Sequence, residues 1–383
     1  MFLLEHDAKQ LLAGAGIPVP EGVFATGLAD LHLPPRDDGT GWVVKAQVRA
    51  GGRGKQGGIR LAPTWADAKH ETEMMIGRVI GGHTVRAVRI ERRVDAALEV
   101  YLSLSVAPAE RQVRIILSAI GGIEIETLHQ RGGIVQSALA DPTPAAVIET
   151  LSRLAEKISG SPGAALRGAG LRLVPQFFAH DLTLLELNPL FVNPDGSWCA
   201  GDAKIVADDN ATMRQPFLRQ LLIEKPRFYP DEARKEEHGF DYIVLDEAGE
   251  IGLLTTGAGL SMLLIDELQG VGLRPYNFLD VRTGGMHGDP SRLIQVLRWI
   301  AEGLCLRVVF CNIFAGSTDL GAFARLLVQA LEAVPALTVP VVIRLVGNGA
   351  EQARAVLDAA GLSMISSLDE AVVRLRGILA GTA

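Results

Sequence analysis

The stretch Leu184-Leu-Glu-Leu-Asn-Pro-Leu-Phe-Val192, with the turn Asn193-Pro-Asp-Gly196 and the run Trp198-Cys-Ala-Gly-Asp-Ala-Lys-Ile205, predicts a β-hairpin. Two apolar runs flank a turn in which proline restricts the backbone and glycine accepts left-handed angles. A loop centred on Asp195 sets the register, so each side chain of one strand has a defined neighbour on the other. The hairpin therefore decides which polar residues of this region lie together.

The predicted register gathers polar side chains on one face of the hairpin. Asn188 lies opposite Asp202, and Glu186 and Lys204 share their face because side chains alternate with a period of two. Two carboxylates, a carboxamide and an ammonium are costly to bury without a counter-charge or a metal ion. A small number of protein oxygen ligands suits a Mg²⁺ ion that keeps water and phosphate oxygens as its other ligands. A solvated face of an edge hairpin explains these residues equally well.

Bulk composition indicates a soluble protein of two or three domains. The chain has 383 residues, 48% of them hydrophobic but only 5% aromatic, which favours layered α/β domains. A net charge of −7 argues against a nucleic-acid-binding surface. Three separated cysteines without CxxC spacing suggest a reducing compartment and no zinc site. The charged first ten residues and the lack of a run of about 18 apolar residues predict no signal peptide, no membrane span and a cytoplasmic location.

Two neighbouring segments near the N-terminus are candidates for phosphate binding. The predicted strand Trp42–Val48 holds Lys45, and a lysine in such a strand either extends from a sheet edge or is held for a ligand. The following loop, Arg49-Ala-Gly-Gly-Arg-Gly-Lys-Gln-Gly-Gly58, offers many backbone N–H groups to phosphates. It is not a Walker A loop, since Lys55 is followed by Gln56. An RNA-binding Gly/Arg tract is disfavoured by the single copy without aromatic residues.

The rest of the chain separates into two patterns. Before residue 224 we expect helices at 4–13, 65–77 and 141–158, strands at 85–90, 98–106, 113–120 and 123–127, and a looser segment from 159 to the hairpin. The charged segment 224–238 is predicted to be a linker. After it, short apolar strands alternate with helices, which predicts a parallel sheet covered on both faces. The strands are expected at 242–245, 251–254, 277–281, 308–314, 341–345 and 364–366, and the helices near 258–269, 290–303, 318–333, 350–360 and 368–380.

Glycine-rich turns follow three of these later strands, at Thr256–Gly259, Phe314–Ser317 and Val346–Gly349. Ligands of open α/β sheets bind at the carboxyl ends of strands, where helix N-termini favour anions. A glycine in a single such turn has an ordinary packing explanation. Three turns together, with Asn277–Val281 ending a fourth strand, favour an anion site.

At this point the residues resemble a known family, the β-subunits of succinate–CoA ligase, over nearly the whole length. The matching stretches are Glu5–Pro20, Val43–Gly58, Gly121–Glu126, Glu186–Leu190, Asp202–Lys204, Asp209–Ala211, Gly257–Leu260, Asn277–Val281, Asn312–Phe314, Arg344–Leu345 and Gly347–Asn348. The resemblance implies an ATP-grasp fold over residues 1–230, with a lobe inserted at about 21–106, and a flavodoxin-like CoA-ligase domain over 239–383.

The resemblance also assigns roles to residues and to partners. Lys45 and Arg53 would hold phosphates, Glu99 the ribose, and the backbone near Glu91 the adenine. A partner α-subunit would carry the phosphorylated histidine and most of the CoA site, in an αβ or α2β2 assembly. Pro20 stands where GTP-selective relatives tend to carry Gln, which favours ATP. The full implied set is Lys45, Gly52, Arg53, Gly54, Glu91 and Glu99 for the nucleotide, Asn188 and Asp202 for Mg²⁺, and Glu186 as the carboxylate beside the histidine.

The implied reaction joins a small carboxylic acid to CoA and splits ATP into ADP and phosphate, by way of an acyl phosphate and a phosphohistidine. The expected acid-binding residues are Asn277, Arg282, Gly316 and Ser317. The chain departs from the family pattern at this end, with Arg282-Thr-Gly-Gly285 in place of a glycine triplet, Ala315–Asp319 in place of Gly-Gly-Ile, Thr256 for Asn, and Gly349 for Asn or Thr. We therefore expect an acid other than plain succinate, with Arg282 pairing with a second anionic group; a solvated loop arginine is the competing interpretation.

Three functions remain open from the sequence. The first is an acid–CoA ligase subunit for succinate or a relative such as malate, a substituted succinate or a sulfonated acid. The second is an ATP-grasp ligase that joins a carboxylate to an amine, which leaves the C-terminal domain without a role. The third is a non-catalytic subunit that binds nucleotide and regulates a partner. Retention of Lys45, Arg53, Glu186, Asn188 and Asp202 disfavours the third.

Overall fold

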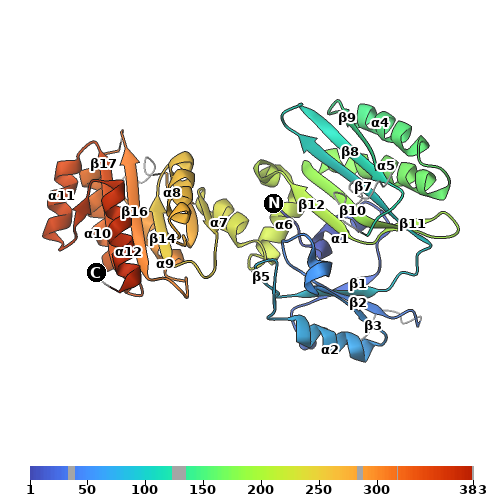
Figure 1. Ribbon diagram of the computed structural model, residues 1–383, viewed down its shortest axis with the longest axis horizontal. Helices are drawn as coiled ribbons and strands as arrows, with labels where there is room; N and C mark the ends of the chain where they lie inside the picture. Colours follow the sequence, from blue (N-terminus) through green and yellow to red (C-terminus); the bar gives the residue numbers. More distant parts are fainter. Residues whose placement is uncertain (33–38, 123–134, 283–287, 317, 382–383) are drawn as a thin grey trace. The chain divides into compact units, whose positions relative to one another are not determined.

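The computed structural model describes residues 1–32, 39–122, 135–282, 288–316 and 318–381. It divides into two compact units, Met1–Arg219 and Gln220–Ala383 (Figure 1). The strand expected at 123–127 and the candidate Ser317 lie outside the described residues.

The first unit contains a four-stranded antiparallel sheet with the order β1-β6-β2-β3. Helix α2 packs on it, and the rings of Trp42 and Trp65 meet edge to face at 5.0 Å. Lys45 lies on β2, which has a partner strand on each side, so the edge-strand interpretation of this lysine is wrong. The elements are β1 (Gly22–Ala25), β2 (Trp42–Ala46), β3 (Ile59–Ala62), α2 (Trp65–Met75), β4 (Val79–Ile80), β5 (His83–Thr84) and β6 (Val88–Arg92).

A second antiparallel sheet of the same unit has the order β11-β10-β7-β8-β9, with β12 also paired to β10. The looser segment expected after residue 158 is wrong, because Ser161–Ala179 forms helix α5. Gly170 packs so closely on Leu151 of α4 that a Cβ would lie 2.3 Å from it, and this packing outweighs the poor helix propensity of glycine. The elements are β7 (Leu98–Ala107), β8 (Gln112–Ser118), β9 (Val135–Ala140), α4 (Pro144–Glu156), α5 (Ser161–Ala179), β10 (Leu182–Val192), β11 (Trp198–Ala200) and β12 (Ala203–Ala207).

The hairpin has the predicted register. Glu186 pairs with Lys204 in the β10–β12 ladder, and Leu190 pairs with Ala200 in the β10–β11 ladder. The two ladders are separated at Asp202, whose N–H donates to the Pro189 carbonyl at 3.1 Å. Because this interruption removes Asp202 from the regular pairing, its side chain is placed by the turn rather than by the sheet.

The second unit is the predicted parallel sheet covered on both faces. Its strand order is β14-β16-β17-β18, all parallel. Two of the six expected strands correct the prediction, because β13 and β15 pair antiparallel in a separate two-stranded sheet. The connection from β13 to the parallel strand β14 is a short turn, too short for a parallel crossover. The elements are β13 (Asp241–Val244), β14 (Ile251–Thr255), α8 (Ala258–Gly270), β15 (Asn277–Asp280), α9 (Ser291–Ile300), β16 (Val308–Ala315), α10 (Leu320–Glu332), β17 (Val341–Gly347), α11 (Ala350–Ala359), β18 (Met364–Ile365) and α12 (Leu368–Ala380).

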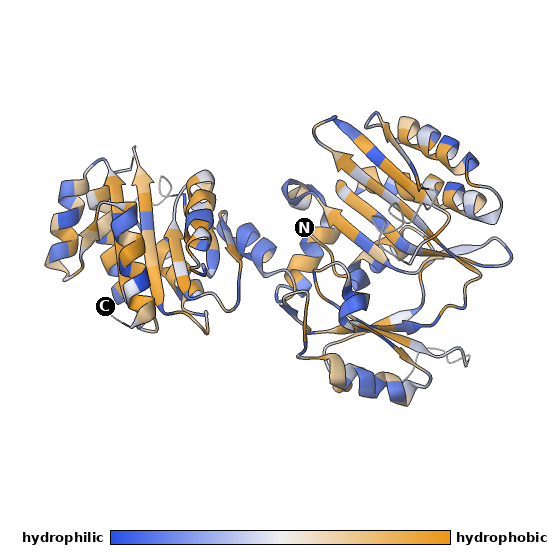
Figure 2. Ribbon diagram, viewed as in Figure 1, coloured by the Kyte–Doolittle hydropathy of each residue, from blue (hydrophilic) through white to orange (hydrophobic). Residues whose placement is uncertain are grey.

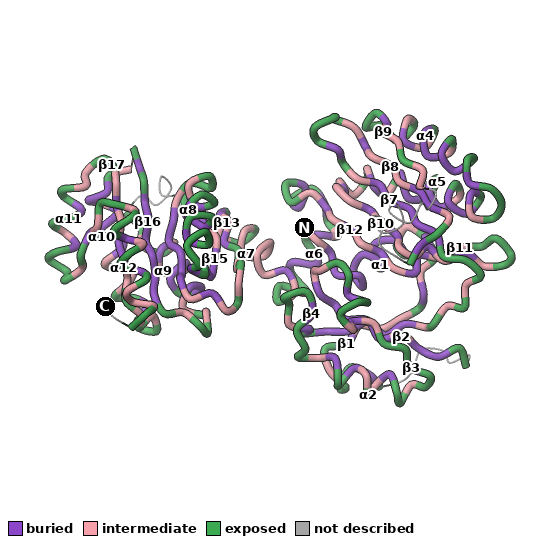
Figure 3. The backbone as a smooth tube through the Cα atoms, viewed as in Figure 1, coloured by how far each residue is buried: buried purple, intermediate pink, exposed green. Residues whose placement is uncertain are grey.

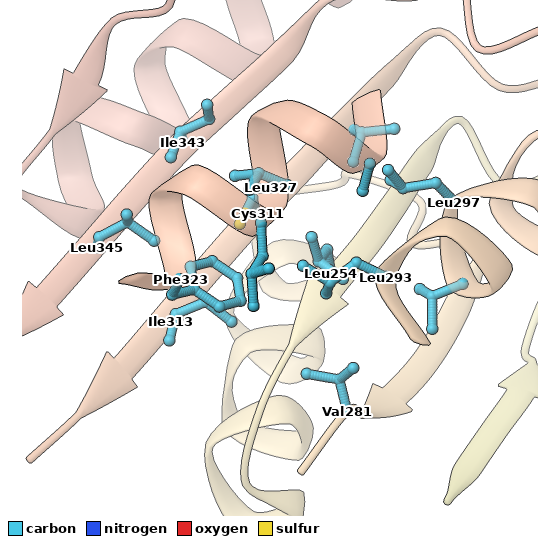
Figure 4. Packing of buried hydrophobic residues seen from close by; sticks show 14 of the residues in the cluster. Leu254, Val281, Leu293, Leu297, Cys311, Ile313, Phe323, Leu327, Ile343 and Leu345 are labelled. Carbon is cyan, nitrogen blue, oxygen red and sulfur yellow. The ribbon is translucent and has the colours of Figure 1, made fainter. Parts of the chain in front are cut away.

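Alternating residues of the central strands form two separate cores. Cys311 and Ile313 of β16 face α9 and α10, where they pack with Leu297 and Phe323 (Figure 4). Phe310, the residue before Cys311 on the same strand, joins the other core with residues of α8 and α12. The period of two thus buries both faces of the sheet, as the near-continuous apolar strands predict.

The segment expected to be a charged linker is largely helical. Helix α6 spans Pro216–Glu224, and α7 spans Pro230–His238 and ends at Gly239, whose φ of 73° closes the helix. Figure 2 shows α7 as a hydrophilic helix, in keeping with its mostly charged sequence. Among the described helices, none is both long and apolar enough to cross a membrane.

Candidate functional site

Helix α1 (Glu5–Gly14) is largely buried within the first unit (Figure 3). Two of its buried charged residues interact with each other. Glu5 and Lys9 stand one turn apart and form an ion pair at 2.8 Å, with their side chains 1% and 0% exposed. Their other partners come from both sheets, at Lys45 and Glu91 of the four-stranded sheet and at Gly201 before β12. The helix therefore joins the two sheets through buried charges.

Lys45 lies at the centre of this cluster. Its ammonium contacts Glu5 Oε1 at 2.9 Å, Glu91 Oε1 at 2.7 Å and the Gly201 carbonyl at 2.7 Å. These three acceptors match the three donors of an ammonium group. The arrangement explains why Lys45 is buried within a central strand, and it makes the cluster a fixed source of positive charge.

Arg53 brings the glycine-rich loop to the hairpin. Its guanidinium donates to the Ala46 carbonyl at 2.9 Å, to Glu5 Oε2 at 2.8 Å and to Asp202 Oδ1 at 3.0 Å. The loop can turn here because Gly52 adopts a φ of 69°, just before the 3₁₀ turn Arg53–Gln56 that contains Gly54. Loop, helix α1 and hairpin thus meet at one guanidinium.

A pocket opens beside this junction, with a volume of about 490 Å³ that includes open solvent. Asn188, Asp202 and Glu186 all line it, and so do Glu5 and Arg53. The Glu186 carboxylate is 3.9 Å from the Lys204 ammonium and 22% exposed. The remaining lining residues are Phe2, Leu3, Val48, Ala50, Gly51, Ala203 and Lys204. The polar face of the hairpin and the glycine-rich loop therefore line the same pocket.

The oxygen donors at the pocket fit a Mg²⁺ ion. Asp202 supplies a carboxylate and Asn188 a carboxamide oxygen, which also accepts the Gly122 N–H at 2.7 Å. No group of three or more His, Cys, Asp and Glu residues among the described parts of the chain could hold a metal by itself. Two oxygen donors suit a hydrated Mg²⁺ whose other ligands are water and phosphate.

Burial and the charges of the cluster shift the pKa values of its carboxyl groups in different directions. Burial opposes ionisation of Glu5, but Lys45, Lys9 and Arg53 outweigh it and hold its pKa well below the usual value. The pKa of Glu91 is lowered in the same way, against burial, chiefly by Lys45 and Lys9. Burial raises the pKa of Asp202, and repulsion from Glu5 adds to this shift. Burial alone would lower the pKa of Lys45, yet Glu5 and Glu91 raise it above its ordinary value.

The lowered pKa values predict acid sensitivity. Glu5 and Glu91 titrate below the ordinary value of 4.5 when folded, so their ionised forms stabilise the fold above that pH. This stabilisation is lost as the pH falls from 4.5 through the folded-state pKa. We expect the urea midpoint to fall over this range and to fall less for Glu5→Gln, measured by denaturation at a series of pH values. An equal fall in both proteins would contradict the assignment to Glu5.

The other candidate nucleotide residues of the first unit are placed differently. Glu99 lies exposed on β7, and its backbone carbonyl accepts the Gly121 N–H at 2.7 Å. The Glu91 carboxylate is turned inward, onto Lys9, Lys45 and Arg89. Sequence reasoning missed the roles of Glu5 and Lys9. Their signal was a pair of opposite charges four residues apart, which places both on one face of the predicted helix.

In the second unit, the candidate acid-binding residues that the structure describes lie after strands or inside the sheet. Asn277 is fully buried, and its amide bonds both backbone groups of Leu253 at 2.8 and 2.9 Å, so it joins β15 to β14. Gly316 is exposed after β16. Arg282 follows β15 with a φ of 50°, and its guanidinium, 56% exposed, is 3.5 Å from the Asp241 carboxylate.

Comparison with known proteins adds to this geometry. Family models match the chain as an ATP-grasp domain over residues 2–192 and a CoA-ligase over residues 254–378. The chain is 37% identical over 388 residues to the succinate–CoA ligase [ADP-forming] subunit beta of Chloroflexus aurantiacus, covering 99% of this chain and 100% of that one. The chain belongs to the succinate–CoA ligase β-subunit family. Within this family it is also 35% identical over 391 residues to the [GDP-forming] subunit beta of Thermus thermophilus, across 100% of both chains.

A solved structure shares the fold of this member of the succinate–CoA ligase β-subunit family. ATP citrate lyase from Methanothrix soehngenii superposes with a TM-score of 0.67, covering 95% of each chain at 18% identity. At that identity the likeness concerns the fold alone. The predicted order of an ATP-grasp fold followed by a CoA-ligase domain is confirmed.

Proposed function

We propose that this chain is the nucleotide-binding β-subunit of an acid–CoA ligase, which makes an acyl-CoA from a carboxylic acid, CoA and ATP. The observation that supports this most is the junction of Arg53 with Asp202 at the pocket. It joins a glycine-rich loop to a hairpin carboxylate in a chain that aligns with succinate–CoA ligase β-subunits over its full length. An amine ligase would leave the second unit without a role.

The chain's own residues would act mainly through charge. Lys45 and Arg53 would neutralise the phosphates of ATP, since a phosphoryl group gains most from fixed positive charge as it transfers. Asn188 and Asp202 would hold Mg²⁺, which supplies further charge neutralisation between phosphates. Lys45 and Arg53 contact Glu5 in the present arrangement, so phosphates would share or replace these contacts. Gly52 and Gly54 would present backbone N–H groups, and Glu99 would meet the ribose.

The proposed reaction balances in three transfers. A histidine of a partner α-subunit takes the γ-phosphoryl group of ATP and releases ADP, with Glu186 beside that histidine. The carboxylic acid then takes the phosphoryl group and forms an acyl phosphate, which frees the histidine. Finally the CoA thiol displaces phosphate and gives acyl-CoA. The partner would also hold most of the CoA, in an αβ or α2β2 assembly.

The test is CoA-dependent release of ADP by the chain co-expressed with an α-type partner. Steady-state assays use a panel of succinate, malate, substituted succinates and sulfonated acids, each with ATP and with GTP. We expect turnover with ATP that requires both CoA and acid. Turnover without CoA would favour an amine ligase, and the absence of turnover with every acid would overturn the proposal.

We also propose that the preferred acid is not plain succinate. The departures from the family pattern lie at Arg282, which follows β15, and from Ala315 onward, where β16 ends. Arg282 is largely exposed, and its guanidinium lies at the long distance of 3.5 Å from the Asp241 carboxylate. A guanidinium so placed is available for a second anionic group. Gly316 and Ser317 would bind the acid, while Asn277 would hold its strand in place.

This acid proposal gives a direct prediction for Arg282→Gln. Loss of a charge-assisted contact is expected to raise the KM of the preferred acid by about tenfold or more. The KM of ATP should stay within about twofold, since the nucleotide residues lie in the first unit. Arg274→Gln is the matched control, an exposed arginine of the same unit bound to Asp246 at 2.7 Å. A clear preference for succinate, or an unchanged KM, would refute the acid proposal.

A further inference from the structure

Lys9 is a buried cation that lies behind the pocket rather than in it. Its side chain is 0% exposed, and it is absent from the pocket lining. The ammonium contacts Glu5 Oε1 at 2.8 Å, both oxygens of Glu91 at 2.9 and 2.7 Å, and the Gly201 carbonyl at 2.8 Å. Because it cannot reach a ligand in the pocket, any effect on the site must pass through these neighbours.

The Gly201 carbonyl is the contact that leads to the site. It accepts from Lys9 at 2.8 Å and from Lys45 at 2.7 Å, so two ammonium groups bind one backbone oxygen. On the other side of the turn, the N–H groups of Gly201 and Asp202 donate to the Pro189 carbonyl at 3.0 and 3.1 Å. The turn between β11 and β12 is therefore held from both sides, and Asp202 is its next residue.

We infer that Lys9 is a positioning residue, which holds the Gly201 carbonyl and thereby sets the place of the oxygen donor Asp202 for a metal–nucleotide ligand. The inference rests on the proposed function, because it assumes that this pocket takes such a ligand. Groups that orient a metal ligand without touching the metal commonly control affinity. Lys9 would do so through the backbone rather than through the ligand side chain itself.

The charge balance of the cluster makes it possible to test a positioning role of Lys9 apart from a role as a counter-charge. Among the described residues, the cluster contains the cations Lys9, Lys45, Arg53 and Arg89 and the carboxylates Glu5, Glu91 and Asp202. Replacing Lys9 by methionine leaves three cations and three carboxylates, so no net charge is stranded. Methionine also fills a similar volume. The substitution removes the donor to Gly201 together with the Lys9 contacts to Glu5 and Glu91, and Lys45 still pairs with both carboxylates.

The experiment compares Lys9→Met with Leu12→Ala in the full chain. Binding of Mn²⁺–ADP is measured by isothermal titration calorimetry, and stability by the urea midpoint. Lys9→Met is expected to raise the Kd of Mn²⁺–ADP by about 10- to 100-fold. Leu12 lies on the same helix, is 0% exposed and does not line the pocket. Leu12→Ala should lower the urea midpoint but leave the Kd within about twofold.

Each outcome decides a separate point. A wild-type Kd in Lys9→Met, with a loss of stability like that of Leu12→Ala, would show a merely structural lysine and overturn the inference. Failure of the wild-type chain to bind Mn²⁺–ADP would overturn the proposed function, and the inference with it. If Lys9→Met does not fold, Gly201→Ala moves the same turn with every charge kept, because a Cβ there would lie 2.4 Å from the Phe191 ring. An unchanged Kd in that variant would equally overturn the inference.

Discussion

Replacing Asp202 by alanine is expected to lower ATP-dependent acyl-CoA formation by about 100- to 1,000-fold. Asp202 is both the proposed carboxylate ligand of Mg²⁺ and the partner of Arg53, at 3.0 and 3.1 Å. Its removal takes one oxygen donor from the pocket and leaves Arg53 to re-orient. The measurement is the steady-state kcat of the chain with its partner, at saturating acid and CoA.

The matched control for Asp202→Ala is Asp195→Ala, in the turn of the same hairpin. Asp195 bonds only locally in the described contacts, to the N–H and hydroxyl of Ser197 at 2.9 and 2.6 Å. Its replacement should leave kcat within about twofold. Full turnover in Asp202→Ala would instead favour a non-catalytic subunit that binds nucleotide and regulates its partner.

Replacing Glu5 by leucine is expected to lower the free energy of unfolding by about 3–5 kcal/mol. The Glu5 carboxylate is 1% exposed and contacts three cations, Lys9, Lys45 and Arg53. Leucine would leave these cations close together with only part of their counter-charge. Urea denaturation near neutral pH measures the loss.

Glu73→Leu provides the comparison for Glu5→Leu. Glu73 is an exposed glutamate on helix α2 of the same unit, so its replacement should change stability by no more than about 0.5 kcal/mol. A loss below about 1 kcal/mol for Glu5→Leu would mean that the cations find other partners, and that the buried cluster is not held by this carboxylate.

The buried cluster also keeps positive charge in place for an anionic ligand before that ligand binds. Lys45 and Arg53, both proposed to bind phosphates, share the carboxylate of Glu5 at 2.9 and 2.8 Å. The pair is therefore kept ionised and close together before any phosphate arrives. Electrostatic groups fixed in this way need little rearrangement when charge develops on a transferring group.

The sequence alone determined most of the secondary structure from residue 241 onward and the register of the hairpin. A near-continuous apolar strand, as at Phe310 and Cys311, indicates burial on two faces without knowledge of distant contacts. Glu186 and Lys204 were paired correctly because the turn residues fix the register locally. Local signals of this kind depend on neighbours within a few residues.

Only the tertiary structure decided which charged residues are buried together and that helices α5 and α7 form. Lys45 is buried because Glu5, 40 residues away, and Gly201, 156 residues away, supply acceptors. Helix α5 forms despite its glycines because Leu151 packs against Gly170. The sequence named Asn188 and Asp202 as candidate ligands, yet Lys9 acquires a role only through a carbonyl 192 residues away. Such energies come from contacts between distant segments, so no local pattern of residues contains them.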